Sequence, residues 1–174
     1  MPEIHLKMLR TGFPFDAVQM PLNPFDGAFR SFEQLVLPEL QRRGIAALGM
    51  KPFGGKGEPI KKAVLTPDEA LRYAMSLPVT TTITGMEKLD ILHQNLKIAQ
   101  SFKPMSAAQM KELRERLQPL AADGRFEHYK VSLQFDNPEA RLAHNFPLDD
   151  QQMEVKEMLK EADNTGKPYP EIKE

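Results

Sequence analysis

The groups that could take part in chemistry are few in this sequence, and several of them follow apolar runs of strand length. Gln19 lies near the end of the run at residues 15–20, and Met50 ends the run at residues 45–50. Three glycines follow, at positions 54, 55 and 57. They would leave backbone N–H groups free to approach a phosphate, although glycines in such loops more often form turns. Gln19 could bind a ligand amide or satisfy a buried backbone group.

Residues of the nucleophile and metal-ligand types indicate no site. The chain has no cysteine, which excludes disulfides, thiolate metal sites and cysteine nucleophiles. Of the four histidines, His5 and His93 are expected on helix surfaces. His128 and His144 have no carboxylate or second histidine at ligand spacing. We therefore predict no metal site.

The composition narrows the class of protein. The chain has 174 residues, of which 41% are hydrophobic and 27% charged, as is typical of a soluble globular domain. Its formal net charge of -1 gives no electrostatic footprint for a nucleic acid. No apolar run approaches the roughly 20 residues of a membrane helix. The first ten residues are amphipathic and do not resemble a signal peptide. We therefore expect no nucleic-acid or membrane partner, and by default a cytoplasmic protein.

Helices and strands are expected to alternate through the first hundred residues. The predicted strands are 15–20, 45–50 and 79–84, with Pro21 stopping the first. The predicted helices are 4–9, 31–43, 66–77 and 88–102, and the last carries an apolar stripe of Leu89, Leu92, Leu96 and Ala99. Alternating units of this kind imply a parallel sheet with right-handed crossovers, so the predicted fold class is α/β.

Short sequence signals predict where the helices begin and end. Ser31 and Gln34 have the spacing of a capping box, as do Thr66 and Glu69. Pro38 should bend or break its helix, and a glycine at position 44 should end it. Beyond residue 104 we expect an amphipathic helix at 106–117, an irregular stretch from 123, a charged helix at 151–162 and a frayed tail at 164–174.

Three segments in order, FDAVQMPLNPFD, IAALGMKPFGGKG and ITGMEKLDILHQNL, resemble the sixth, seventh and eighth βα units of the aldo-keto reductases. The resemblance covers about residues 2 to 106, and GRFEHYK is similar to the C-terminal extension of a bacterial-type branch of that family. It implies a partial (β/α)8 TIM barrel made of the last three βα units, followed by a helical and irregular extension. Residues 1–105 would be the C-terminal half of the barrel, and residues 106–174 the extension and tail.

The resemblance also implies contacts with a nicotinamide cofactor. Gln19 matches the family's glutamine that holds the nicotinamide carboxamide. Met50 stands where most relatives place an aromatic ring against the nicotinamide, although it could equally be a plain core residue. Lys51, Phe53 and Gly54 belong to the loop that passes the pyrophosphate in the family.

The adenosine end of the cofactor would lie at the third unit. Gln94 and Asn95 match the family's acid–amide pair near the adenine, although a solvated helix face would explain them too. Gly85 and Met86 fall where many relatives carry a basic residue and a hydroxyl for the 2′-phosphate, and Ile91 falls where many carry an arginine. The cofactor implied by the family is NADP, with NAD possible.

The family's catalytic residues have no counterpart in this sequence. They are a tyrosine, a lysine, an aspartate and usually a histidine, and all four belong to the first half of the barrel. Because Tyr73, Tyr129 and Tyr169 do not follow matching strands, we assign no catalytic residue. We further expect Val18, Ala47 and Ile83 to face the barrel interior and to lose their opposing layer.

Two functions from different classes follow. The first is an aldo-keto reductase-like oxidoreductase that reduces a carbonyl by hydride transfer from NADPH, present here in a truncated form. The second is a non-catalytic nucleotide-binding or interaction module, a pseudo-enzyme fragment. In either case unpaired sheet edges favour a partner half-barrel, a homo-oligomer, or a cover from the C-terminal extension.

Overall fold

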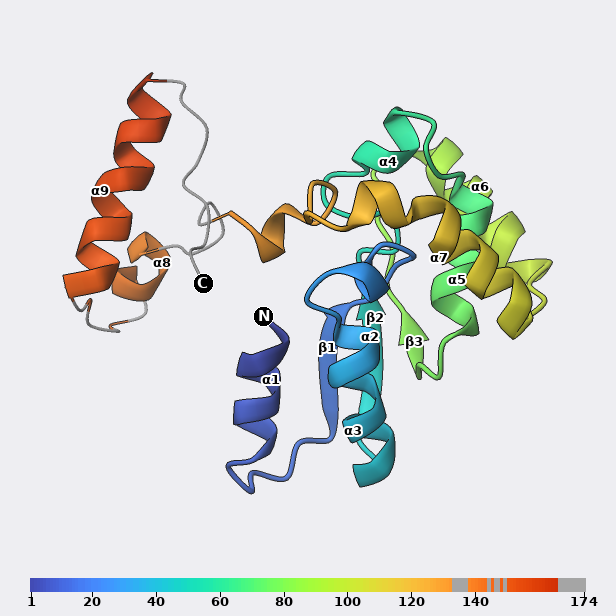
Figure 1. Cartoon of the computed structure of the whole chain (residues 1–174), viewed down its shortest axis with the longest axis horizontal. Coiled ribbons are helices and arrows are strands. Elements are labelled where there is room, and N and C mark those ends of the chain that lie inside the picture. Colours follow the sequence, from blue (N-terminus) through green and yellow to red (C-terminus); the bar gives the residue numbers. More distant parts are fainter. Residues whose placement is uncertain (133–137, 144, 146–147, 149, 166–174) are drawn as a thin grey trace. The chain divides into compact units, whose positions relative to one another are not determined.

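The structure, a computed structural model, describes residues 1–132, 138–143, 145, 148 and 150–165. The chain divides into two compact units, residues 1–127 and residues 128–174 (Figure 1). The boundary that the family resemblance places after residue 105 stays a prediction.

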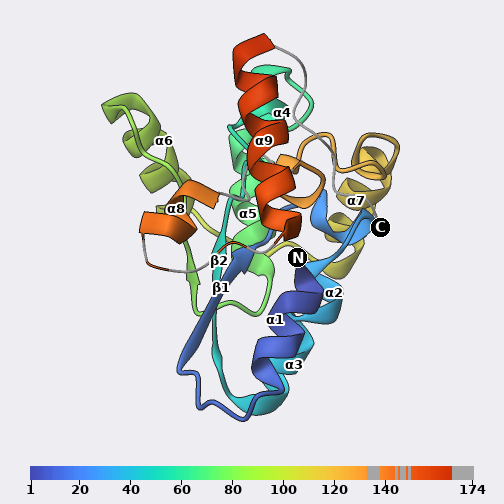
Figure 2. The same ribbon diagram turned by 90° about the vertical axis from the view of Figure 1, so that its left-hand side faces the viewer.

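A three-stranded parallel sheet lies at the centre of the first unit. Its strands are β1 (Ala17–Pro21), β2 (Ala46–Met50) and β3 (Thr81–Thr82), in the order β1-β2-β3, and Figure 2 shows β1 and β2 side by side. The α/β class with a parallel sheet is therefore confirmed. Pro21 was expected to stop the first strand but is its last residue, paired with Met50. A proline is tolerated there because β1 is an edge strand of the described sheet.

The helices before β2 follow the local signals closely. α1 spans Pro2–Leu9, and the expected helix after Ser31 is divided into α2 (Phe32–Leu35) and α3 (Leu37–Arg43). Pro38 causes this break, since a proline within a helix cannot donate the backbone hydrogen bond. Ser31 caps α2 through a bond from the backbone of Gln34, whose own side chain turns instead to the carbonyl of Gly27. The predicted capping box at Ser31 is thus half formed.

The loop after β1 carries two fully buried polar side chains that the sequence did not single out. Asn23 accepts a hydrogen bond from the backbone N–H of Phe25 and donates to Glu127 over 3.0 Å. Asp26, in the 3-10 turn η1 (Asp26–Ala28), accepts from the Ser31 hydroxyl and from two backbone N–H groups at the start of α2. These bonds fix the loop at the carboxyl end of β1.

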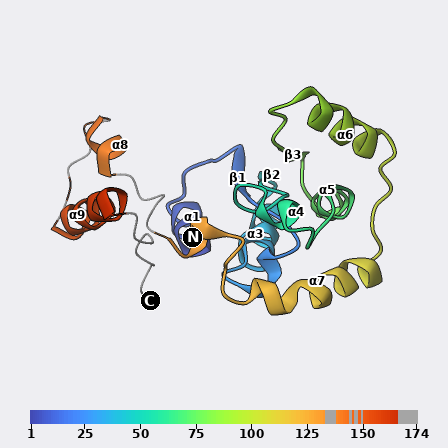
Figure 3. The same ribbon diagram turned by 90° about the horizontal axis from the view of Figure 1, so that it is seen from above.

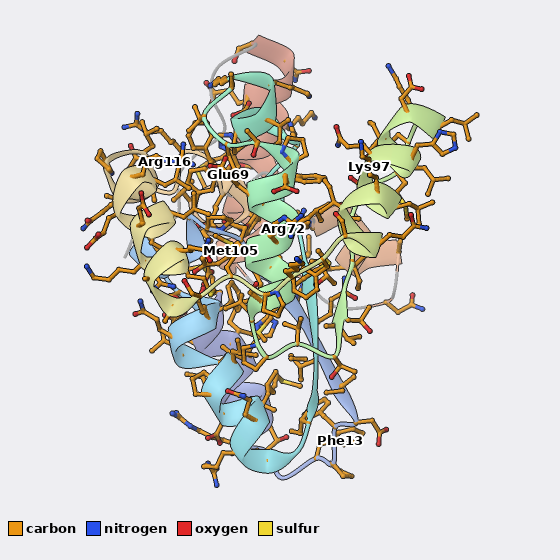
Figure 4. The ribbon with its side chains drawn as sticks, turned by 90° about the vertical axis from the view of Figure 1, so that its right-hand side faces the viewer. Phe13, Glu69, Arg72, Lys97, Met105 and Arg116 are labelled. Carbon is orange, nitrogen blue, oxygen red and sulfur yellow. The ribbon has the colours of Figure 1, made fainter. Side chains whose placement is uncertain are left out.

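The helices after β2 are α4 (Glu58–Lys61), α5 (Pro67–Ser76), α6 (Leu89–Gln100) and α7 (Ala107–Ala121). Complete capping boxes begin α5, at Thr66 and Glu69, and α7, at Ser106 and Gln109. Figure 4 shows Arg116 of α7 beside Glu69 of α5, and the two side chains form an ion pair. α7 therefore packs with the preceding α/β units of residues 1–127 rather than apart from them.

One face of the sheet is covered and the other is open. Ala47 belongs to the hydrophobic core together with Met20, Leu40 and Tyr73, and the partly buried Val18 packs against this core. Seen from above, α1, α3 and α5 lie on the same side of the strands (Figure 3). The expectation that Val18 and Ala47 face a barrel interior is therefore wrong, because their side chains point to the helices. Ile83, which is 39% exposed, does lie outside that core.

The second unit begins with a 3-10 turn, η2 (His128–Lys130), and continues with α8 (Pro138–Ala143) and α9 (Asp150–Thr165), which contact each other. α9 confirms the predicted charged helix. Of the expected tail, residues 166–174 lie outside the described residues. In the described part of the chain, no helix combines the length and the apolar character needed to cross a membrane.

Candidate functional site

A pocket of about 730 Å³ opens at the carboxyl ends of the three strands. Parallel strands bring the loops that follow them to one edge of a sheet, where α/β proteins commonly bind ligands. The volume lies within the range of small-molecule sites. Seven of the eight residues proposed from the sequence line this pocket: Gln19, Met50, Lys51, Phe53, Gly54, Gly85 and Gln94.

Gln19 and Met50 meet across β1 and β2. The sheet register pairs Gln19 with Leu48 and Pro21 with Met50, so the side chains of Gln19 and Met50 lie on the same open face. The amide nitrogen of Gln19 donates to the Met50 sulfur over 2.9 Å. Gln19 is exposed, so its side chain is not a buried amide bonded to backbone.

The loop after β2 turns sharply at Gly54, where φ is +72°. The backbone N–H of Gly54 donates to the carbonyl of Lys51 and that of Gly55 to the carbonyl of Phe126, over 3.0 and 2.8 Å. These two N–H groups are therefore not free to approach a phosphate, and the expected mode of contact is wrong for them. A Cβ at Gly54 would lie 2.9 Å from the carbonyl oxygen of Phe126, so glycine is required by packing as well as by the turn.

The charged side chains around the pocket are mostly cationic. Lys51, Lys56 and Lys61 line it, together with one carboxylate, Glu87. The lysines come from the loop after β2 and from α4, whereas Glu87 comes from the turn between β3 and α6. A concave site with an excess of positive charge attracts anions. The lysine side chains, rather than the N–H groups of Gly54 and Gly55, are thus the candidate phosphate ligands.

The turn between β3 and α6 and the helix α6 itself each contain one buried polar atom that lacks a partner among the described residues. Asn95 is 5% exposed, and its amide nitrogen donates to the carbonyl of Gly85 over 3.1 Å. Among the described residues, its carbonyl oxygen and the Thr84 hydroxyl have no hydrogen-bond partner. Thr84 lines the pocket, and Asn95 supports its wall through Gly85 without lining it. Buried atoms of this kind ordinarily bind water or a ligand.

Several lining residues escaped the sequence analysis. Lys56 lies between Gly55 and Gly57, and the short helix α4 places Lys61 on the pocket wall. The sequence did contain a signal for the start of α4, because Pro59 follows Gly57 at the spacing of a proline in the first turn of a helix. In the structure Gly57 is the N-cap of α4 and has a positive φ. Glu87, two residues after Gly85, gave no pattern that distinguishes it from an exposed surface acid.

A second polar cluster lies away from the pocket. The hydroxyl of Tyr73 on α5 donates to a carboxylate oxygen of Glu33 on α2 over 2.7 Å, and Arg114 on α7 donates to the same hydroxyl over 3.0 Å. Burial raises the pKa of Glu33, and burial together with the Glu33 charge raises the pKa of Tyr73. Tyr73 therefore remains protonated at neutral pH and ties three helices together.

No family model, curated protein or solved structure matches this chain. Within the described residues there is also no group of three or more His, Cys, Asp or Glu side chains that could hold a metal. The pocket, with its amides, its thioether and its lysines, is thus the candidate functional site of the described residues.

Proposed function

We propose that this chain carries the cofactor-binding part of an aldo-keto reductase-like oxidoreductase, and that the pocket at the ends of β1, β2 and β3 takes a nicotinamide dinucleotide. The observation that carries the proposal is that seven residues chosen from three separate sequence segments line one pocket. NADP is the cofactor of the resembled family, and NAD is the other candidate.

The open sheet face supports placing the three βα units in a (β/α)8 barrel. Consecutive strands are neighbours, and the core helices pack on the face that carries Val18 and Ala47. On the other face Gln19 and Ile83 are exposed and Leu48 is half-buried. Barrels have helices on the outer face only, whereas doubly wound sheets have them on both. In this proposal a partner half-barrel or a second copy of the chain covers the open face.

The residues of the pocket fit the three chemical parts of a dinucleotide. The Gln19 amide can donate to and accept from a carboxamide, and the Met50 thioether can pack on a ring face. Lys51, Lys56 and Lys61 supply cations for the diphosphate. At the β3 end, the partnerless hydroxyl of Thr84 and the amide of Gln94 line the pocket and can bond to the adenosine part.

When bound, such a cofactor supplies a hydride for carbonyl reduction. The described residues of this chain bind and orient it. Among the described residues that line the pocket, none is a tyrosine or a histidine, and Tyr73, which is bonded to Glu33, points into the helix layer. In this proposal the tyrosine acid of the resembled family therefore has no counterpart among those lining residues.

The lack of a tyrosine or histidine among the described lining residues also favours the second candidate, a nucleotide-binding module without turnover. The two candidates predict the same binding and differ in activity. They are separated by supplying the purified chain with NADPH or NADH and simple aldehydes, then following the loss of cofactor absorbance.

The binding experiment titrates the chain with NADPH and with NADH, following cofactor fluorescence, while size-exclusion chromatography records whether the species is compact. Saturable binding in the micromolar range, weakened in Gln19→Leu, is expected. Absence of saturable binding of either dinucleotide to a compact chain would contradict the proposal.

A further inference from the structure

The order of the strands gives the pocket a direction. β1, which carries Gln19, is followed by β2 with its lysine-rich loop, and then by β3 with the turn at Gly85. A dinucleotide with its carboxamide at Gln19 and its diphosphate at the lysines would have its adenosine ribose at the β3–α6 turn. The inference below rests on this placement, and so on the proposed function.

The β3–α6 turn carries a carboxylate where that ribose would lie. A Cβ built on Gly85 would lie 2.8 Å from Oε1 of Glu87, so the carboxylate is folded directly over Gly85. Glu87 and Gly85 both line the pocket. The carbonyl of Gly85 is held by the buried amide of Asn95 over 3.1 Å, which fixes the turn beneath the carboxylate.

The cations of the pocket lie on another segment. Lys51 and Lys56 belong to the loop after β2, and Lys61 ends α4. Lys88 follows Glu87 in the sequence but is exposed and does not line the pocket. At the ribose end of the pocket the lining side chains therefore offer the Glu87 carboxylate, the Thr84 hydroxyl, the apolar Ile91 and the neutral amide of Gln94.

A carboxylate interacts in opposite ways with the two forms of the adenosine ribose, the one with free hydroxyls and the one with a 2′-phosphate. A carboxylate accepts hydrogen bonds from free ribose hydroxyls, as acidic residues do in NAD-binding folds. It repels a 2′-phosphate, which carries about -1.5 to -2 charges at pH 7. We propose that Glu87 is a specificity-determining residue of this pocket, and that it selects the dinucleotide without a 2′-phosphate, NAD(H), over NADP(H).

The test compares dissociation constants of NADH and NADPH for the full chain and three variants. The wild type should bind NADH roughly tenfold more tightly, which is the effect of one partly screened charge pair at a protein surface. Glu87→Gln should bring the two constants close together, and Glu87→Lys should favour NADPH. Asp90→Asn is the matched control, because Asp90 is an exposed acid in the first turn of α6 that does not line the pocket. This variant should retain the preference for NADH.

Salt provides a second readout, because a charge effect should shrink as ionic strength rises. The ratio of the two constants should therefore fall toward unity with added salt in the wild type and change little in Glu87→Gln. Tighter binding of NADPH by the wild type, or an equal preference in wild type and Glu87→Gln, would overturn the role of Glu87 while leaving the proposed function intact. If neither dinucleotide binds, the proposed function fails and this inference fails with it.

Discussion

The side-chain amide of Gln19, near the end of β1, donates a hydrogen bond to the sulfur of Met50, at the end of β2, over 2.9 Å. A thioether is a weak acceptor, so this bond orients the amide without satisfying its full bonding capacity. Gln19 is exposed on the open face of the sheet. A ligand amide can therefore replace the sulfur with a stronger partner at small cost.

Replacing Gln19 by leucine should weaken dinucleotide binding about tenfold, because one or two hydrogen bonds of about 1 kcal/mol each are lost. The free energy of unfolding should change little, since the side chain is exposed. Fluorescence titration and urea unfolding measure the two effects. Gln41→Leu, an exposed glutamine of α3 outside the pocket lining, is the control. Equal affinities of Gln19→Leu and wild type would exclude a role for Gln19 in binding.

The turn at Gly54 should tolerate no side chain. Gly54→Ala combines a positive φ of +72° with a Cβ 2.9 Å from the Phe126 carbonyl oxygen, and we expect a loss of about 2–4 kcal/mol in urea unfolding. Gly57→Ala has a similar φ of +65° but open space around its Cβ, so its cost should be about 1 kcal/mol. Equal losses in the two variants would show that Phe126 does not restrict the turn.

The pocket lysines should set the salt dependence of ligand binding. In Lys56→Gln/Lys61→Gln, dinucleotide affinity should fall and should respond less to added salt, because two charges near the diphosphate are removed. Lys97→Gln/Lys103→Gln removes the same charge from exposed positions outside the pocket lining, and Figure 4 shows Lys97 on α6. If the two double variants behave alike, the lysines act through net charge rather than at the site.

Glu33 should make stability depend on pH. Burial raises its pKa above the ordinary 4.5, and the Tyr73 hydrogen bond and the Arg114 charge offset this only in part. A raised pKa in the folded state means that the protonated carboxyl stabilises the fold below pH 4.5, and that this contribution is lost as pH rises through the folded-state pKa.

The free energy of unfolding of the wild type, compared with Glu33→Gln, should therefore decrease as pH rises above 4.5. Urea unfolding at a series of pH values measures this difference. Glu112→Gln, which removes an exposed carboxyl of α7, should leave the pH dependence of the wild type in place. A wild type that gains stability over Glu33→Gln with rising pH would indicate a lowered pKa and contradict the burial effect.

The helix ends could be predicted because their signals are local. The capping box of Thr66 and Glu69, the break at Pro38 and the left-handed Gly44 each depend on a few neighbouring residues. The positions of the strands could be predicted from the sequence, but the face of the sheet that packs against the helices could not. Ala47 lies in a run that is apolar on both faces, and the run of Val18 carries a polar residue on each face, Asp16 on one and Gln19 on the other. Neither run contains an alternation that shows which face the helices cover.

A similar limit applies to α6. The predicted apolar stripe contains Leu89 and Leu96, which are 71% and 46% exposed, whereas Asn95 and Ile98 are buried. Periodicity shows which residues share a face but not which face has a neighbour. The pocket was accessible to sequence reasoning where residues follow strands, as Gln19 and Met50 do. Lys61 and Glu87 become part of it only through α4 and the turn at Gly85.

The central claim, that the carboxyl ends of β1, β2 and β3 form a dinucleotide site, is tested most directly by mapping backbone amide NMR shifts while NADH is added to the labelled chain. We predict that the shifts concentrate at Gln19, Met50, residues 51–57 and Gly85, and that they saturate together. Saturating shifts confined to another part of the chain, such as the small pocket between Glu69 and Arg116, or no shifts at all, would contradict the account.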